Sequence, residues 1–201
     1  MGQVTTIEQL RALVPEPSPT AFAKIRDRLC DQGVAFLQRS PFLVLATVGT
    51  WGLELSPKGD APGFVEVVDD RTLLIPERKG NQFALSLANV LADPRVGILA
   101  IRPATHEVLR ISGRATLIDD ADVCERLSAG GRPATLAIRV EIDRAAFHCV
   151  RSAKRAGLWQ PETWDDPTRI SFGRIYAQAL ARPDVEELFD DLTEKSNATL
   201  Y

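Results

Sequence analysis

Short apolar segments separated by turn residues follow one another from residue 42 to residue 150, and this pattern constrains the fold most. Phe42–Thr47, Thr72–Ile75 and Val96–Ile101 are examples, each followed closely by glycine or proline. Strands this short at close spacing are typical of antiparallel hairpins. We expect a closed antiparallel barrel of six strands, because closure removes the edges that apolar strands would expose. A helix capped by Asn81 is expected between the fourth and fifth strands, and the irregular alternation of Leu136–Val150 predicts a bend.

Helical patterns flank the predicted barrel on both sides. Three short helices are expected early in the chain, beginning near Thr6, Ser18 and Asp31, with the second running to residue 29. Two more are expected late, over Ser171–Ala181 and Asp184–Lys195. We therefore predict that residues 1–40 pack as a helical segment on the barrel of residues 41–150, and that residues 151–201 complete the same domain.

Composition and charge exclude several classes of protein. The chain has 24 basic and 27 acidic residues, a net charge of −3 and no long basic run, so nucleic acid is not an expected partner. No apolar run approaches the roughly 18 residues that cross a bilayer, so no membrane association is expected. Cys30, Cys124 and Cys149 are odd in number and form no CxxC motif. With no secretory signal at the N-terminus, these cysteines favour a cytoplasmic location.

The common catalytic motifs are missing from the sequence. It contains no P-loop, no glycine-rich dinucleotide motif, no HExxH zinc motif and no nucleophile elbow. A hydrolase would have to use Ser56 or Ser112 together with His148. His148 and Cys149 are neighbours on a predicted strand and point to opposite faces, so they do not form a dyad. The sequence therefore identifies no catalytic residue and no metal site.

Two predicted loops each combine a cation, a glycine and a small polar side chain. Ser56–Asp60 and Pro76–Asn81 leave strands of the same part of the sheet, and the second is expected to run into a helix N-terminus. Unpaired N–H groups and the helix dipole favour an anion there. Arg78 can bind phosphate oxygens through two N–H groups, with Lys58 beside it. The loops are a candidate phosphate site, although their spacing alone favours the alternative that Lys58, Arg78 and Lys79 are ordinary solvated charges.

Several segments of the chain follow one another in the order found in one known family. They are Ser40–Thr47, Leu55–Val65, Asp70–Arg78, Gly80–Asn81, Leu91–Gly97, Leu109–Ala115, Phe147–Cys149 and Gly157–Pro161. Together they resemble the pyridoxamine 5′-phosphate oxidase-like FMN-binding split-barrel family, and in particular its flavoproteins of unassigned substrate. The resemblance spans residues 36 to 164, and the ordered series is more specific than any one segment.

The resemblance implies a mainly β fold with flanking helices, built on a six-stranded antiparallel Greek-key split β-barrel. It also implies a homodimer with one FMN in each of two clefts between the subunits. By position, Lys58, Arg78 and Asn81 fit the role of holding the FMN phosphate, and Ser56 and Lys79 are weaker candidates.

In such proteins a basic and aromatic segment near the C-terminus commonly reaches the flavin site across the dimer. Arg151, Arg155 and Trp159 match that segment loosely. Trp159 would cover the flavin ring or the substrate; the alternative is an apolar plug for the mouth of the barrel.

The sequence departs from the family's name-giving enzymes in one respect. Those enzymes carry an Arg–aliphatic–His motif near the C-terminus, and no Arg-X-His occurs in this chain. We therefore expect an FMN-dependent oxidoreductase that transfers hydride or electrons between a reduced nicotinamide or small organic substrate and an acceptor, but not pyridoxamine phosphate oxidation. The alternatives are a non-catalytic flavin, haem or deazaflavin binding module, the hydrolase above, and an interaction protein that uses the acidic stretch Asp184–Glu194.

Overall fold

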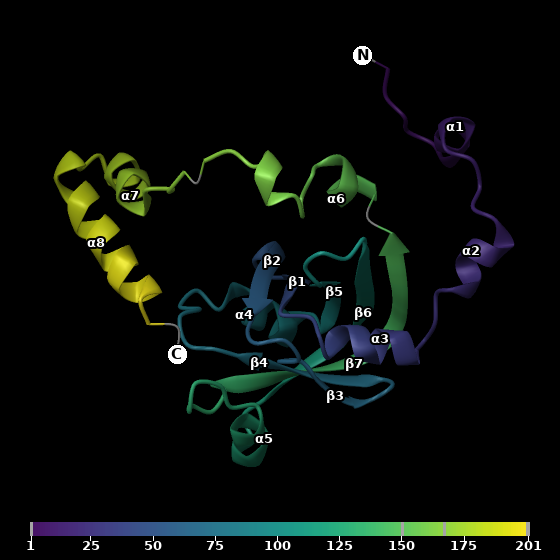
Figure 1. The fold of residues 1–201 in the computed structure, drawn as a ribbon, viewed down its shortest axis with the longest axis horizontal. Helices are drawn as coiled ribbons and strands as arrows, with labels where there is room; N and C mark the ends of the chain where they lie inside the picture. Colours follow the sequence, from purple (N-terminus) through teal and green to yellow (C-terminus); the bar gives the residue numbers. More distant parts are fainter. Residues whose placement is uncertain (1, 150, 167, 200–201) are drawn as a thin grey trace.

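One antiparallel sheet in the strand order β2-β1-β5-β6-β7-β4-β3 forms the centre of the computed structural model, which describes residues 2–149, 151–166 and 168–199 (Figure 1). The strands are β1 (Phe42–Gly49), β2 (Gly52–Gly59), β3 (Glu66–Asp69), β4 (Thr72–Glu77), β5 (Arg95–Ile101), β6 (Glu107–Ile118) and β7 (Leu136–Cys149). The mainly β class with flanking helices is confirmed. The strand count is seven rather than the expected six.

The sheet has two ends instead of the expected full closure. β2 pairs with β1 and β3 pairs with β4, and in the described part of the chain no pairing joins β2 to β3. The two longest strands, β6 and β7, pair with each other along their whole length and form a two-stranded ribbon. β5 pairs with β6 at one end of this ribbon, and β4 pairs with β7 at the other end. The seven strands therefore form two halves, one containing β2, β1 and β5 and the other containing β4 and β3, which β6 and β7 connect.

A bulge bends the sheet where the two halves meet. Ser112 lies opposite Arg144 and Gly113 lies opposite Ile142, so one residue of β7 is left over between them. This is the bend expected in Leu136–Val150, although residue 150 itself lies outside the described residues. A side chain at Gly113 would place a Cβ 2.1 Å from the carbonyl oxygen of Glu141, which explains the glycine.

The core lies inside the curved sheet and is closed by helix α3 (Asp31–Leu37). Alternate residues of β1 point inward because side chains of a strand alternate between its faces. The ring of Phe36 on α3 meets Phe147 of β7 edge-on at 5.4 Å. The fully buried side chains that form the centre of the core include Leu37, Leu43, Leu45, Leu73, Ile75, Leu109, Ile138 and Val140.

Helix α4 (Leu85–Ala92) is held on the β1–β2 hairpin by one buried amide. Nδ2 of Asn89 donates to the carbonyl oxygen of Gly52 at 3.0 Å, and Oδ1 accepts from the backbone N–H of Trp51 at 3.1 Å. Asn89 is fully buried, so these bonds satisfy a side chain that would otherwise be costly to bury.

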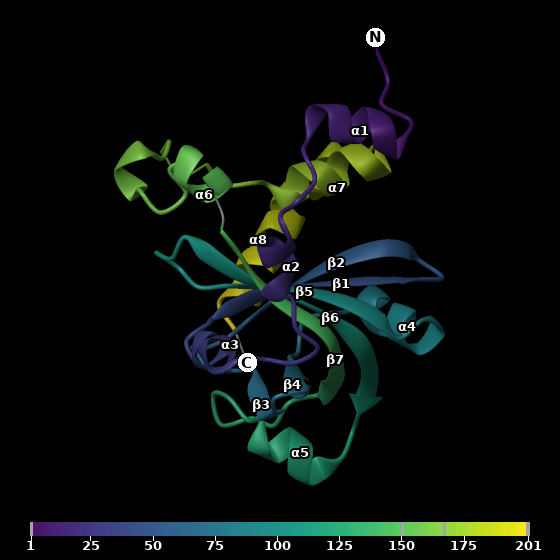
Figure 2. The same cartoon turned by 90° about the vertical axis from the view of Figure 1, so that its right-hand side faces the viewer.

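The remaining helices lie at the flanks of the barrel (Figures 1 and 2). They are α1 (Ile7–Leu13), α2 (Pro19–Ala23), α5 (Ala121–Arg126), α6 (Arg151–Arg155), α7 (Phe172–Leu180) and α8 (Glu186–Asn197), with short 3-10 turns at Pro161–Thr163 and Pro183–Val185. As expected, Thr6 caps α1 through its side chain. None of the described helices is long and apolar enough to traverse a bilayer.

The second predicted helix was too long. It ends at Ala23 rather than at residue 29, because the chain turns at Lys24 and a single residue, Arg26, then bridges to the sheet. Arg26 forms an antiparallel bridge with Ala145, through N–H···O distances of 3.0 and 2.7 Å in the two directions. This bridge adds a partner to β7 beyond the bulge, where β4 no longer pairs.

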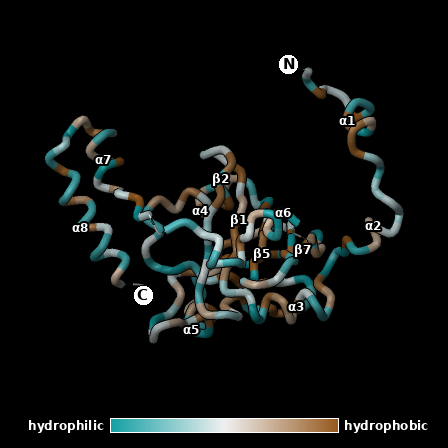
Figure 3. The backbone as a smooth tube through the Cα atoms, turned by 45° about the horizontal axis from the view of Figure 1, so that its top comes forward, coloured by the Kyte–Doolittle hydropathy of each residue, from teal (hydrophilic) through white to brown (hydrophobic). Residues whose placement is uncertain are grey.

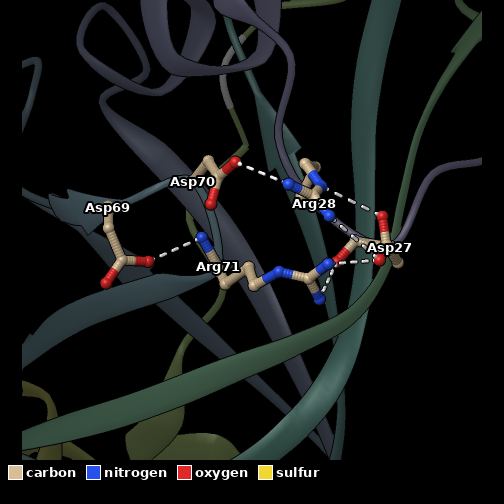
Figure 4. A network of polar contacts seen from close by, with 5 residues as sticks. All are labelled: Asp27, Arg28, Asp69, Asp70 and Arg71. Atoms are coloured by element: carbon tan, nitrogen blue, oxygen red, sulfur yellow. Dashed lines mark hydrogen bonds and ion pairs between the residues drawn. The ribbon is translucent and has the colours of Figure 1, made fainter.

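A cluster of charges fastens the same segment to the β3–β4 turn (Figure 4). Arg28 reaches Asp70 of the turn at 3.5 Å and Asp27 at 3.2 Å, while Arg71 of the turn also pairs with Asp27. The carboxylate of Asp69 accepts from the backbone N–H of Arg71. The segment between α2 and α3 is therefore tied to both halves of the sheet.

Candidate functional site

A pocket of about 310 Å³ lies where β2 and β4 end, and it brings together the predicted phosphate-binding residues. Its lining includes all five of them: Ser56, Lys58, Arg78, Lys79 and Asn81. Glu77 also lines the pocket, although no sequence pattern assigns it a role.

Lys58 reaches this pocket from a strand rather than from the predicted loop. β2 continues through Pro57 to Gly59, and Lys58 pairs in register with Leu43 on the core side of β1. Proline is tolerated there because β2 is an edge strand and Pro57 needs no N–H bond on its open side. The result is a lysine that is only 8% exposed.

The ammonium group of Lys58 is paired with the carboxylate of Glu77. Nζ lies 2.5 Å from Oε2, and both side chains are buried. Glu77 is the last residue of β4, and the carboxylate projects toward β2 from the opposite side of the pocket. An ammonium carries three N–H donors, so this ion pair leaves Lys58 with others for a ligand.

Arg78, directly after β4, is held by two groups on different loops. Its Nε donates to Oδ2 of Asp60 at 2.8 Å, and Nη1 donates to the carbonyl oxygen of Leu127 at 2.7 Å. The Asp60 side chain is almost completely buried in this contact. Asp60 thus joins Glu77 as an acidic partner that sequence reasoning missed, since each pairing links residues 18 or 19 positions apart.

The sequence predicted that Asn81 caps a helix, and this prediction is wrong. α4 begins at Leu85, and the residue preceding it is Ala84. Instead, Oδ1 of Asn81 accepts from the N–H of Ala84 at 3.1 Å, and Nδ2 donates to Oε1 of Glu77 at 3.2 Å. The pocket is therefore not built on the N-terminus of α4, and its cationic groups are side chains.

The side-chain donors suit a phosphate group. Lys58 and Arg78 are each fixed by one carboxylate, which orders the cation before a ligand arrives, while Lys79 is exposed at the rim. Three cations face two carboxylates, so the pocket keeps a small positive balance. Ser56 and Asn81 add neutral donors for oxygen atoms.

The structure does not bring the three C-terminal candidates into this pocket. Arg151 and Arg155 lie on α6 and are exposed. Trp159 lines a separate, mostly apolar pocket of about 430 Å³, together with Val108, Arg110, His148 and other residues. Its Nε1 donates to the carbonyl oxygen of Thr105 at 3.0 Å, which fixes the ring over the β5–β6 loop.

The serine and histidine pairing required for a hydrolase is not formed. Ser112 lies opposite Arg144, whereas His148 lies opposite Val108, four residues further along the ribbon. Four residues of strand span about 13 Å, which is too far for a hydrogen bond. Ser56 is on β2, with three strands between it and β7. The described residues also contain no cluster of three or more His, Cys, Asp or Glu side chains that could hold a metal ion.

The chain is similar to one family of known proteins. The family model described as pyridoxamine 5′-phosphate oxidase matches residues 29–149, more than half of the chain. No curated protein matches the sequence.

Three solved structures illustrate the similarity in fold. HupZ of Group A Streptococcus is 15% identical with a TM-score of 0.48, over 58% of this chain and 91% of that one. General Stress Protein 26 of Bacillus anthracis is 14% identical with a TM-score of 0.45, over 56% and 88%. An FMN-binding protein from Syntrophomonas wolfei is 12% identical with a TM-score of 0.44, over 57% and 80%. With every TM-score below 0.5, the assignment of the family comes from the match to the family model.

Proposed function

The chain belongs to the pyridoxamine 5′-phosphate oxidase family, and from that premise we propose that it is a flavoprotein that holds FMN at the pocket between β2 and β4. The observation that carries the proposal is the lining of this pocket by Ser56, Lys58, Arg78, Lys79 and Asn81. Ser56 and Lys58 lie on β2, and Arg78, Lys79 and Asn81 follow β4, which is not a neighbour of β2 in the sheet. All five residues nevertheless line one cavity of about 310 Å³.

In this proposal the phosphate group lies among the cations and the ring extends out of the pocket. Lys58 and Arg78 supply charged hydrogen bonds, and the two carboxylates that hold them keep the guanidinium and ammonium oriented. Lys79, Asn81 and Ser56 complete the donor set. FMN, when bound, supplies the redox chemistry itself, and the chain's own residues bind the group, orient it and keep water away.

We further propose that a second copy of the chain completes each site, as a homodimer. The C-terminal candidates Arg151, Arg155 and Trp159 lie outside the pocket between β2 and β4 of their own chain. In the homodimer they would contact the flavin bound by the partner. An exposed apolar face supports this arrangement. Leu53 and Leu55 of β2 are 71% and 64% exposed, and beside them a hollow of about 690 Å³ is lined by Val44, Ala46 and Leu99 among others. Apolar patches of this kind mark surfaces that another protein covers.

The reaction class that we propose is oxidoreduction with a reduced nicotinamide or a small organic substrate as the donor. Hydride transfer to a flavin needs no side-chain nucleophile, which agrees with the absence of a serine and histidine pair. Pyridoxamine phosphate is not the proposed substrate, since no Arg-X-His occurs in the chain. We place the protein in the cytoplasm, where its three free cysteines would stay reduced.

The first experiment is a visible absorption spectrum of freshly purified protein, followed by mass identification of any released chromophore. The proposal predicts the spectrum of an oxidised flavin and the mass of FMN, either directly or after incubation with FMN and removal of the excess. A haem or deazaflavin spectrum, or no uptake of FMN, would contradict it. Steady-state oxidation of NADH or NADPH by the FMN-loaded protein then separates an enzyme from a binding module, because a module would bind FMN without turnover.

A further inference from the structure

The α7–α8 hairpin lies apart from the barrel, and hydrophilic and hydrophobic residues are interspersed along its two helices (Figures 1 and 3). On α7, Phe172 and Ile175 are 48% and 50% exposed; on α8, Leu188 and Leu192 are 56% and 50% exposed. The only buried residues that the two helices contribute, among those described, are Gly173 and Ala177 of α7. An amphipathic helix normally buries its apolar stripe, so this surface lacks its cover.

The hairpin is nevertheless firmly built as a unit. The carboxylate of Asp190 accepts from Ser171 Oγ at 2.7 Å and from the N–H of Gly173 at 2.9 Å, which ties α8 to the start of α7. The rings of Tyr176 and Phe189 stack with centroids 4.4 Å apart. Hydrogen bonds to the carboxylate of Asp190 also lower its pKa and favour the charged form that accepts them. The two helices therefore keep their exposed leucines and aromatic residues in a fixed arrangement.

The N-terminal arm, residues 1–30, also exposes apolar side chains. Helix α1 has no buried residue, and Ile7, Leu10 and Leu13 are all exposed along it. The arm is weakly basic, with four basic and three acidic residues in positions 1–30, whereas positions 171–197 hold six acidic and three basic residues. The two surfaces are both apolar, and their charges do not oppose contact.

Within one chain these two surfaces lie apart. Figure 1 shows α7 and α8 on one side of the barrel and α1 on the other, with both arms extending toward the same end of the molecule. In Figure 2, viewed along the line that joins them, α1 lies above α7 and the two helices overlap, so they lie at a similar depth in the view of Figure 1. A twofold axis along the viewing direction of Figure 1 would place a second copy over that end and exchange the two sides. The hairpin of each copy would then meet the N-terminal arm of the other.

We propose that the α7–α8 hairpin of one copy packs on helix α1 of a second copy, so that two equivalent arm-to-hairpin contacts clasp the dimer. A twofold dimer makes every such contact twice and needs no third component. The inference rests on the homodimer proposed above and adds to it a second contact surface between the copies. It also gives residues 1–30 and 171–197 a role that the flavin pocket does not.

The test compares two substitutions at exposed apolar positions with two matched controls, all in the full-length chain. Leu10→Glu changes α1 and Leu188→Glu changes α8. Gln9→Glu and Gln178→Glu add the same charge to α1 and α7 at exposed polar positions. The dimer dissociation constant is measured by sedimentation equilibrium without added flavin. We expect each leucine variant to weaken the dimer at least about tenfold, and each control to leave it unchanged.

Mixing the two leucine variants provides the diagnostic result. Each variant's homodimer has both contacts damaged, whereas a mixed dimer of Leu10→Glu with Leu188→Glu retains one intact contact. The mixture should therefore dimerise more tightly than either variant alone. Chemical unfolding confirms that the barrel is intact, since both leucines are exposed on helices outside it.

The other outcomes separate this inference from the proposed function. A dimeric wild type whose dissociation constant is unaffected by Leu10→Glu or Leu188→Glu would overturn the clasp and leave the flavin proposal standing. An effect of Leu188→Glu alone, with no gain on mixing, would point to hairpin-to-hairpin contact and also overturn it. A wild type that is monomeric with FMN bound would contradict the homodimer and the clasp together.

Discussion

Nζ of Lys58 lies 2.5 Å from Oε2 of Glu77, and these two side chains, 7% and 6% exposed, form the buried ion pair at the base of the proposed phosphate pocket. Glu77 also accepts from Nδ2 of Asn81 through its other oxygen. The carboxylate thus orders two of the donors that the phosphate would meet.

Replacing one member of this pair should lower the free energy of unfolding far more than replacing both. Lys58→Met leaves the Glu77 carboxylate buried without its cation, and we expect a loss of about 3–5 kcal/mol in the free energy of unfolding. Lys58→Met combined with Glu77→Leu should recover most of that loss, because no uncompensated charge remains. Urea unfolding of the three proteins measures both values. A single variant with wild-type stability would show that the pair is not buried.

Arg78 should contribute to FMN affinity. In Arg78→Ala the charged hydrogen bonds to phosphate are lost, and we expect FMN binding to weaken by about 1.5–3 kcal/mol, which is roughly ten- to a hundred-and-fifty-fold in the dissociation constant. Fluorescence titration of the free flavin measures it. Arg95→Ala is the matched control, since Arg95 is also paired with an aspartate but is not part of the pocket lining. Equal affinity of Arg78→Ala and wild type would remove Arg78 from the site.

Adding one methyl group at the bulge between β6 and β7 should destabilise the fold. Gly113→Ala would place its Cβ 2.1 Å from the Glu141 carbonyl oxygen, so the backbone must shift. We expect a destabilisation of about 1–3 kcal/mol, measured by urea unfolding at fixed protein concentration. Gly97→Ala on β5 is the control, because its Cβ would meet only the Cβ of Ala46 at 3.6 Å. Comparable stability of the two variants would mean that the close approach at the bulge does not exist.

Acid should release the segment between α2 and α3 from the β3–β4 turn. Hydrogen bonds from Arg28 and Arg71 lower the pKa of Asp27 from 3.8 to about 2. A carboxyl whose pKa is depressed in the folded state stabilises it above the ordinary value, and that contribution is lost as pH falls from 3.8 toward 2. Exchange of the Leu29 amide, which donates to the Asp70 carbonyl oxygen at 2.7 Å, should accelerate in that window relative to a core amide.

Asp27→Asn serves as the control for this pH effect. It cannot ionise, so the Leu29 amide should already exchange quickly at neutral pH and show little further change on acidification. If the variant retained the acid-dependent step of the wild type, the clamp in Figure 4 would not be its cause.

The strands were predictable because alternation and turn residues are local signals. β1 and β5 appear where the apolar runs Phe42–Thr47 and Val96–Ile101 indicated, since each has a core face and needs only neighbouring strands to bury it. The end of β2 was missed because Pro57 and Gly59 read as loop residues, yet both are compatible with an edge strand.

The site was only partly predictable. Its cations and Asn81 could be selected by residue type and position, and they do line one pocket. Their partners could not, because the pairing of Lys58 with Glu77 and of Arg78 with Asp60 depends on how two separate hairpins are brought together. The helix start was misplaced because α4 begins four residues after Asn81, and the Asn81 oxygen accepts from the N–H of Ala84, the residue before the helix.

The most direct measurement of the central claim is a parallel titration of the apoprotein with FMN and with riboflavin, which has the same ring but no phosphate. If the pocket lined by Lys58 and Arg78 holds the phosphate, FMN should bind at least about tenfold more tightly than riboflavin, and Arg78→Ala should reduce that ratio. Equal binding of the two flavins by the wild type, or binding of neither, would contradict the account.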